Sequence, residues 1–166
     1  MLRRLAPALL LALATPGGAA LAAPVEAGQP AFYPAAADAR ADLDAALVDA
    51  ARSGRFAVVV FGGDWCHDST GLARVLTGPA FRDEFGARFS VTFIDVGVPQ
   101  TGNGRNLDLI ARYGVKRMRG TPALFVIGPD GRPRNSRRDA QSWRNADSRG
   151  EAAILDWFRR LSAKLD

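Results

Sequence analysis

The chain has 166 residues, of which 48% are hydrophobic and 23% are charged, and its formal net charge is +5 at pH 7. This balance is typical of a folded globular chain and excludes a disordered or fibrous protein. The basic residues are nearly all arginines and lie scattered, apart from a short cluster at 132–138 that contains no aromatic residue. We read this cluster as a solvated loop and expect no nucleic-acid partner.

The first 22 residues have the pattern of a cleaved secretory signal peptide. Arg3 and Arg4 precede a short apolar run, and small residues end the stretch at 20–22. The apolar run is too short to span a bilayer, so we expect no stable membrane insertion once the signal is removed. The alternatives for this stretch are a retained membrane anchor and a disordered leader.

Export would place the protein in the periplasm or outside the cell, where disulfides form. Cys66 is the only cysteine, so the fold must depend on packing without an internal disulfide. We expect a signal peptide over residues 1–22, a proline-containing lead-in segment over residues 23–37 and one folded domain over residues 38–166.

The predicted elements alternate between helices and strands. Apolar residues spaced three and four apart predict a first helix that ends at Gly54. Five consecutive apolar residues at 57–61 then predict a strand buried on both faces. The remaining predicted elements are helices at 68–76 and 78–89, a strand at 89–98, a helix at 106–114, a strand at 123–127 and a helix at 148–165. This alternation predicts an α/β fold around a mostly parallel sheet.

The stretch DWCHDS, residues 64–69, places the cysteine between a buried strand and a helix. Unpaired N–H groups and the dipole at a helix N-terminus favour the thiolate, which is the nucleophilic form. The alternative is a buried, inert cysteine, although this corner is a poor place for burial. Cys66 and His67 alone fall short of the ligand set of a structural metal site, so we expect no metal and no cofactor.

The order of the motifs resembles the thioredoxin-like family. A buried strand that ends in an aromatic residue is followed by Trp65-Cys66, a helix, and later Thr121-Pro122 before another strand. In particular, FGGDWCHDS and the later RNLDLIARYGV resemble periplasmic bacterial thioredoxin-like proteins whose motif reads Trp-Cys-x-Asp-Cys. The resemblance covers about residues 40–165 and implies a thioredoxin-like fold with a central mixed sheet and helices on both faces.

The resemblance also implies catalytic roles. Cys66 becomes the attacking cysteine, Pro122 a cis-proline that faces it, and Thr121 a source of backbone groups for an extended substrate segment. Ser69 stands where the family has its second, resolving cysteine, and a serine hydroxyl cannot release a mixed disulfide by internal attack. Val60 stands where many relatives have a buried acid that assists this step.

The neighbours of the cysteine have further candidate roles. Ser69 can donate a hydrogen bond to the thiolate from its hydroxyl or its backbone N–H. His67 favours the thiolate if it is cationic, and otherwise it is a solvated spectator. Trp65 either packs on the domain or shields the thiol, and we include Trp65, His67 and Thr121 as candidate substrate-binding residues. We expect Asp68 to stabilise the start of its helix.

Three functions are compatible with this sequence. The first is thiol-disulfide exchange through Cys66 alone, with an external thiol resolving the mixed disulfides formed with protein or low-molecular-weight substrates. The second is a non-catalytic peptide-binding or chaperone-like module that uses the groove beside Pro122. The third is a structural domain that docks on a partner through the loop at 132–138.

Overall fold

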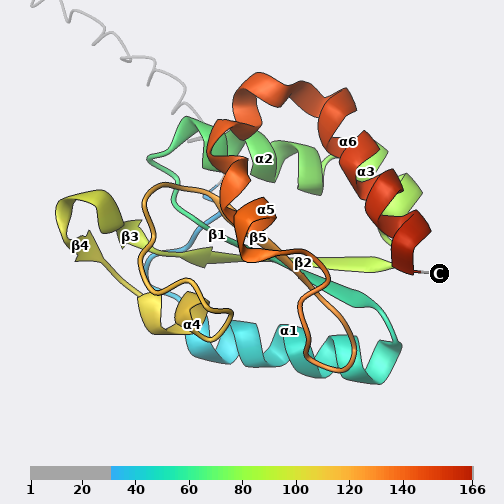
Figure 1. The fold of residues 1–166 in the computed structure, drawn as a ribbon, viewed down its shortest axis with the longest axis horizontal. Coiled ribbons are helices and arrows are strands. Elements are labelled where there is room, and N and C mark those ends of the chain that lie inside the picture. Colours follow the sequence, from blue (N-terminus) through green and yellow to red (C-terminus); the bar gives the residue numbers. More distant parts are fainter. Residues whose placement is uncertain (1–30, 166) are drawn as a thin grey trace, which may run out of the picture.

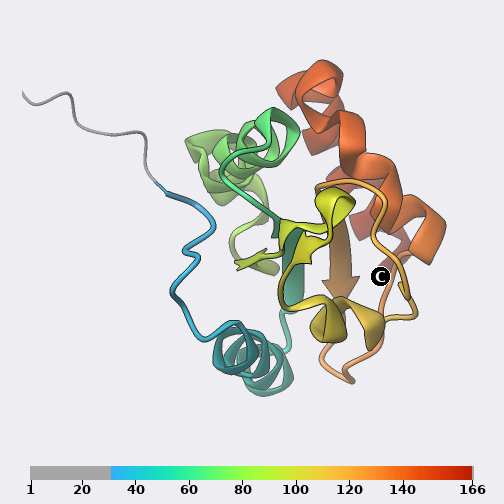
Figure 2. The same cartoon turned by 90° about the vertical axis from the view of Figure 1, so that its left-hand side faces the viewer.

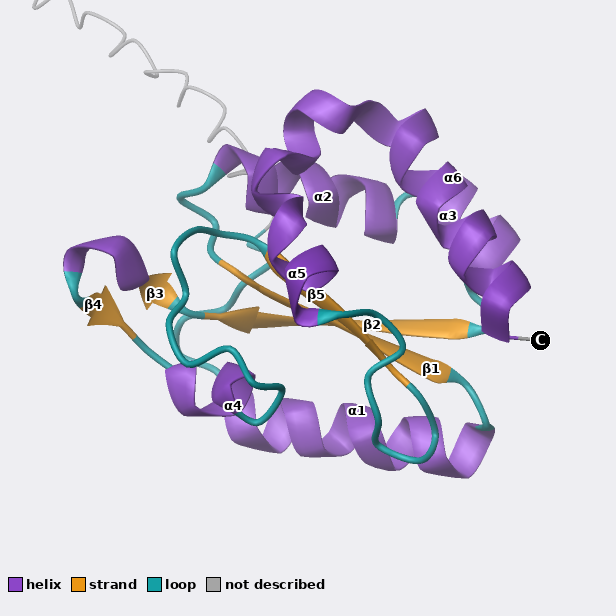
Figure 3. Cartoon of the chain, in the orientation of Figure 1, coloured by secondary structure: helices purple, strands orange, loops and turns teal. Residues whose placement is uncertain are grey.

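The computed structural model describes residues 31–165, so the predicted signal peptide and the first part of the lead-in lie outside the described residues. The described chain forms three layers, with a sheet between two layers of helices (Figures 1 and 3). None of the helices within residues 31–165 has the length and apolar character needed to cross a bilayer.

The helices and strands follow one another much as their apolar patterns predict. In chain order they are α1 (Ala39–Ser53), β1 (Phe56–Gly62), α2 (His67–Thr77), α3 (Pro79–Phe85), β2 (Phe89–Asp95), β3 (Gly97–Val98), β4 (Asn103–Gly104), α4 (Leu107–Ala111), β5 (Ala123–Ile127), α5 (Arg137–Ala140) and α6 (Ala146–Leu165). Two 3-10 helices, η1 (Pro99–Thr101) and η2 (Gln141–Asn145), complete the described chain.

The main sheet has three strands in the order β2-β1-β5. β1 runs parallel to β2, with Phe56 opposite Phe89, and antiparallel to β5, with Phe61 opposite Ala123. The sheet is therefore mixed, and the mostly parallel sheet predicted from the alternation alone is wrong. The connection at 96–122 starts and ends at the same edge of the sheet, since Ile94 near the end of β2 and Ala123 at the start of β5 both lie opposite Phe61.

The first helix is delimited by a capping aspartate and a terminal glycine. The side chain of Asp38 accepts hydrogen bonds from the N–H groups of Arg40 and Ala41 at the start of α1. Gly54 closes the helix in a left-handed conformation, with φ 74°, and donates its N–H to the carbonyl of Ala50. The predicted end of this helix at Gly54 is confirmed.

Each face of the sheet has its own hydrophobic core. On one face, the side chain of Phe158 from α6 is fully buried among aromatic rings. Its ring centroid lies 4.9 Å from that of Phe81 and 5.5 Å from that of Phe89. On the other face, α1 contributes Leu43 to a second core that includes Phe125 of β5. The central strand β1 packs into both cores, so its near-continuous apolar sequence is explained.

Several predicted boundaries differ from those observed. The helix predicted at 78–89 ends at Phe85, and Phe89 is already the first residue of β2. The strand predicted at 89–98 ends at Asp95, because Gly97 has φ 60° and turns the chain into the separate β3–β4 ladder. The helix predicted at 106–114 is limited to 107–111, and Gly114, with φ 81°, lies in a turn beyond it. The last helix has a break at Gly150, whose φ of 74° and ψ of 162° are not helical.

Candidate functional site

Cys66 lies at the N-cap position of α2, directly after the turn that follows β1. Its backbone is extended, with φ −100° and ψ 118°, and its carbonyl accepts the N–H of Thr70 at 3.0 Å in the first turn of the helix. The helix has eleven residues, and its unpaired N–H groups and dipole favour negative charge at this end. The placement of the cysteine at a strand-to-helix corner is therefore as predicted.

Cys66 is nevertheless buried, with only 8% of its surface exposed, and the expectation that this corner is a poor place for burial is wrong. The cause is a segment distant in sequence. The Thr121 carbonyl lies across the thiol and accepts a hydrogen bond from Sγ at 3.5 Å. The thiol thus faces the loop that leads into β5.

Thr121 and Pro122 form the opposite wall of the site. The peptide bond between them is cis, and both residues are buried. They directly precede β5, whose first residue, Ala123, pairs with Phe61 near the end of β1. This register brings Thr121 and Pro122 to the same edge of the sheet as Cys66. The hydroxyl of Thr121 is buried and has no hydrogen-bond partner among the described residues.

Ser69 lies one turn into α2 and has no exposed surface. Its hydroxyl has no hydrogen-bond partner among residues 31–165. It packs closely against β1, since a Cβ added to Gly62 would lie 2.7 Å from Ser69 Oγ. The predicted hydrogen bond from Ser69 to a Cys66 thiolate therefore stays a prediction.

Trp65 and His67 lie on the outer side of the thiol. The Trp65 side chain is 51% exposed, and its Nε1 donates to the Gly97 carbonyl of β3 at 3.0 Å. Its indole also covers Gly63, where an added Cβ would lie 2.6 Å from Nε1. The side chain of His67 is 81% exposed, with Nε2 3.4 Å from a carboxylate oxygen of Asp68. Trp65 is thus packed on the domain while His67 lies at the surface.

Asp68 connects the helix of the site to the last helix of the chain. Its carboxylate accepts the backbone N–H of Asp147 at 3.0 Å, near the start of α6. An added Cβ on Gly71 would lie 2.8 Å from Asp147 Oδ1, so α2 and α6 approach closely here. The carboxylate therefore anchors α6 on α2, a contact that the sequence did not reveal.

Two residues beside the site, Asp64 and Tyr33, were not predicted from the sequence. The Asp64 carboxylate accepts the backbone N–H groups of Phe32 and Tyr33, at 2.9 and 3.1 Å. The Tyr33 hydroxyl is buried and donates to the carbonyl of Ser69 at 3.2 Å. Figure 2 shows the segment before α1 running down beside the sheet to the start of α1. The only sequence signal for this contact was the aromatic pair between the prolines of the lead-in.

The position of Tyr33 beside the site changes the pKa of its hydroxyl. Burial raises the pKa of Tyr33 well above the ordinary value of 10.0, and the charges of Cys66 and Asp64 raise it further. Folding therefore favours the neutral hydroxyl. The resulting contribution to stability is complete below pH 10 and is lost as the pH rises from there toward the pKa of the folded state.

We expect the free energy of unfolding to fall as the pH rises past about 10, and to fall less steeply in Tyr33→Phe. Denaturant unfolding at a series of alkaline pH values measures this slope. Tyr113→Phe is the comparison, because burial also raises the pKa of Tyr113. An unchanged slope in Tyr33→Phe would show that this hydroxyl does not couple folding to pH. At neutral pH the same variant loses one hydrogen bond, a cost of about 1 kcal/mol.

Val60 occupies the position where the family resemblance places a buried acid. It is fully buried in β1, opposite Phe93 on one side and Leu124 on the other.

Among residues 31–165, no group of three or more His, Cys, Asp or Glu side chains is arranged to hold a metal ion.

These observations define the class of protein. A mixed sheet lies between helices, and a cysteine at a helix N-terminus faces a cis-proline loop at the edge of the sheet. No family model matches the chain, and no curated protein does. Among solved structures, the chain is similar to the disulphide isomerase from Xylella fastidiosa Temecula1, with 30% sequence identity and a TM-score of 0.69.

That similarity covers 78% of this chain and 95% of the isomerase. The chain belongs to the thioredoxin-like family. The predicted fold, a thioredoxin-like α/β domain with a central mixed sheet flanked by helices on both faces, is confirmed.

Proposed function

We propose that this protein carries out thiol-disulfide exchange with a single nucleophilic cysteine, Cys66. The observation that carries the proposal is the position of Sγ, which lies at the N-terminus of α2 and 3.5 Å from the Thr121 carbonyl beside Pro122. The similarity to a disulphide isomerase supports the same general chemistry. In this proposal Cys66, Ser69 and Pro122 are catalytic, and Trp65, His67 and Thr121 contact the substrate.

The reaction has two exchange steps. The Cys66 thiolate attacks one sulfur of a substrate disulfide, a new bond forms between Cys66 and that sulfur, and the other sulfur leaves as a thiolate. A thiolate from a second molecule then attacks the mixed disulfide and releases Cys66. Because Ser69 has no sulfur to attack with, this second thiol must come from outside the chain.

In this proposal an extended protein segment binds beside the Thr121 backbone. The Thr121 carbonyl accepts the hydrogen bond from Cys66 Sγ. A bound substrate that displaces this hydrogen bond would free the cysteine for attack. Protein disulfides and low-molecular-weight disulfides are both substrates in this proposal. We also propose that residues 1–22 direct the chain to the periplasm or outside the cell, and that residues 23–37 precede a domain over 38–166.

The alternative is a peptide-binding or chaperone-like module that does not react. The burial of Cys66, at 8% exposed, favours this second candidate, because a thiol must be reached before it can exchange. The third candidate, docking through the loop at 132–138, stays a prediction.

The deciding experiment treats the reduced protein with glutathione disulfide and follows the intact mass. We expect one glutathione per chain, complete loss of the adduct in Cys66→Ser, and release of the adduct by added thiol. Ser90→Ala, which removes a buried hydroxyl of β2 near the start of β1, is the control and should still form the adduct. If the wild-type protein forms no adduct while an extended peptide still binds it, the non-catalytic module is the better assignment.

A further inference from the structure

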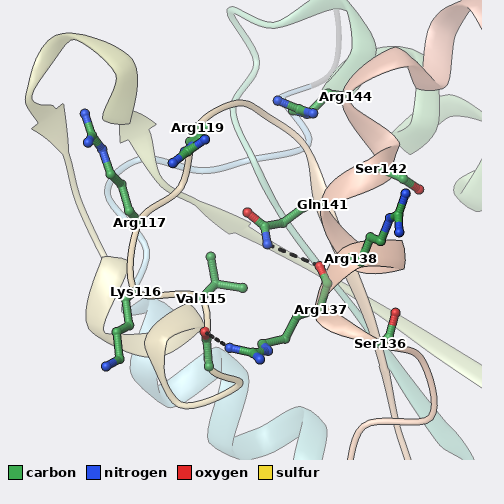
Figure 4. Close-up of a pocket in the computed structure, with 11 residues that line it drawn as sticks. Val115, Lys116, Arg117, Arg119, Ser136, Arg137, Arg138, Gln141, Ser142 and Arg144 are labelled. Atoms are coloured by element: carbon green, nitrogen blue, oxygen red, sulfur yellow. Dashed lines mark hydrogen bonds between the residues drawn. The ribbon is translucent and has the colours of Figure 1, made fainter.

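A strongly basic pocket lies beside the candidate site. It has a volume of about 700 Å³ and opens between the loop that precedes Thr121 and the segment that forms α5 and η2. Figure 4 shows these two segments facing each other across the pocket. The six cationic residues that line it are Lys116, Arg117 and Arg119 on the loop, and Arg137, Arg138 and Arg144 on the opposite segment.

The positive charge of this pocket is not neutralised within the described chain. No acidic residue lines the pocket, and none of its six cationic residues forms an ion pair within residues 31–165. Arg137 donates only to a backbone carbonyl, that of Gly114, at 3.1 Å. Elsewhere arginines do have acidic partners, as in the pairs Arg55 with Asp49 and Arg159 with Glu84. A concave surface lined by one sign of charge attracts an oppositely charged ligand.

The pocket is continuous with the loop that covers Cys66. Arg119 and Gly120 directly precede Thr121, whose carbonyl contacts the thiol at 3.5 Å. The stem of Arg144 lies against the backbone at Gly120, since a Cβ added there would lie 2.5 Å from Arg144 Cδ. A chain segment that passes the Thr121 backbone would therefore reach this pocket within a few residues.

The lining favours carboxylates over nucleic acid. Guanidinium groups bind carboxylates through paired, charge-assisted hydrogen bonds. Bases of a single-stranded nucleic acid bind by stacking on aromatic side chains, and no aromatic residue lines this pocket.

We propose that this pocket binds acidic side chains of an extended protein segment, and so selects acidic substrates for the neighbouring thiol. The selection of substrates rests on the proposed function of Cys66, whereas the binding of acidic peptide does not. In the exchange step the chemistry is unchanged: the Cys66 sulfur bonds to one substrate sulfur, and the other leaves as a thiolate.

Binding is tested first, with a fluorescent glutamate-rich peptide and its glutamine analogue. In the Cys66→Ser protein, so that no covalent bond forms, we expect the acidic peptide to bind about 10-fold more tightly at low salt. Arg119→Gln combined with Arg138→Gln should remove this preference. The control combines Arg52→Gln with Arg82→Gln, two exposed arginines of α1 and α3, which gives the same net charge and should keep the preference.

Exchange is tested second, with the wild-type chain and the same two peptides carrying a disulfide. We expect the acidic peptide to react about 10-fold faster, and the pocket variants to lose this ratio. Equal binding of the acidic peptide and its glutamine analogue would overturn the assignment of the pocket. An equal loss of the preference for the acidic peptide in the pocket variants and the control variants would also overturn it. An oligonucleotide of equal charge that displaces the peptide at lower concentration would overturn it in favour of nucleic acid. Selective binding without any Cys66 adduct would support the pocket and contradict the proposed exchange.

Discussion

Ser69→Cys is expected to convert the chain from single-thiol exchange to a two-thiol cycle. A thiol at this position, one turn from Cys66 on the same helix, can attack the mixed disulfide from within the protein. Because such an attack is intramolecular, we expect the adduct to be lost about 100-fold faster than in the wild-type chain. The Ser69→Cys substitution also replaces a buried hydroxyl that has no hydrogen-bond partner among the described residues, so we expect no loss of stability.

The measurement is the lifetime of the glutathione adduct after excess reagent is removed, together with insulin reduction by the variant. Ser90→Cys is the matched control, because the Ser90 hydroxyl is also buried without a partner among the described residues. Ser90 pairs with Ala57 near the start of β1, about 16 Å along the strand from the end that leads to Cys66. A long-lived adduct in Ser69→Cys would show that position 69 cannot reach the reacting sulfur.

The largest effect on stability is expected for Phe158→Ala. The side chain is fully buried between α3, β2 and the rest of α6, where it contacts the rings of Phe81, Phe89 and Trp157. Its removal leaves a cavity that the surrounding rings fill only in part. We expect a loss of about 3–5 kcal/mol in the free energy of unfolding, a large share of the stability of an ordinary domain.

Denaturant unfolding measures this loss, with Phe158→Leu as the control that keeps most of the buried volume and should lose less. Because the N–H of Asp147 near the start of α6 bonds to Asp68 on α2, loosening of α6 should also reach the helix that carries Cys66. The rate of Cys66 alkylation in Phe158→Ala measures this coupling. Equal stability of the alanine and leucine variants would contradict the packing argument.

Local patterns predicted much of the fold. The buried strand at 57–61 and the helix after Cys66 were visible because apolar runs and helical spacing depend on residues within a few positions of one another. The end of α1 at Gly54 could be predicted because a left-handed backbone conformation at the end of a helix favours glycine. The motif around Cys66 and the Thr121-Pro122 pair indicated the family, and through it the mixed sheet.

Other features depend on contacts between distant segments. The direction of β5 follows from the path of the connection at 96–122, which leaves β2 and enters β5 at the same edge of the sheet. The burial of Cys66 follows from the loop at Thr121, 55 positions away. The attachment of Tyr33 to the site depends on Asp64, 31 positions away, and no local spacing reveals such a pair.

The basic pocket also combines a feature that the sequence predicts with one that only distant contacts create. The sequence contains one cluster of arginines at 132–138. Arg134 in that cluster pairs with Asp130, while Arg137 and Arg138 line the same pocket as a separate basic stretch at 116–119. By itself the sequence determined most of the elements, the single cysteine at position 66 and the serine at position 69, because these depend on residue identity and short-range spacing. The tertiary structure alone decided which side chains cover the thiol and which charges meet beside it, because packing brings together groups that the chain keeps far apart.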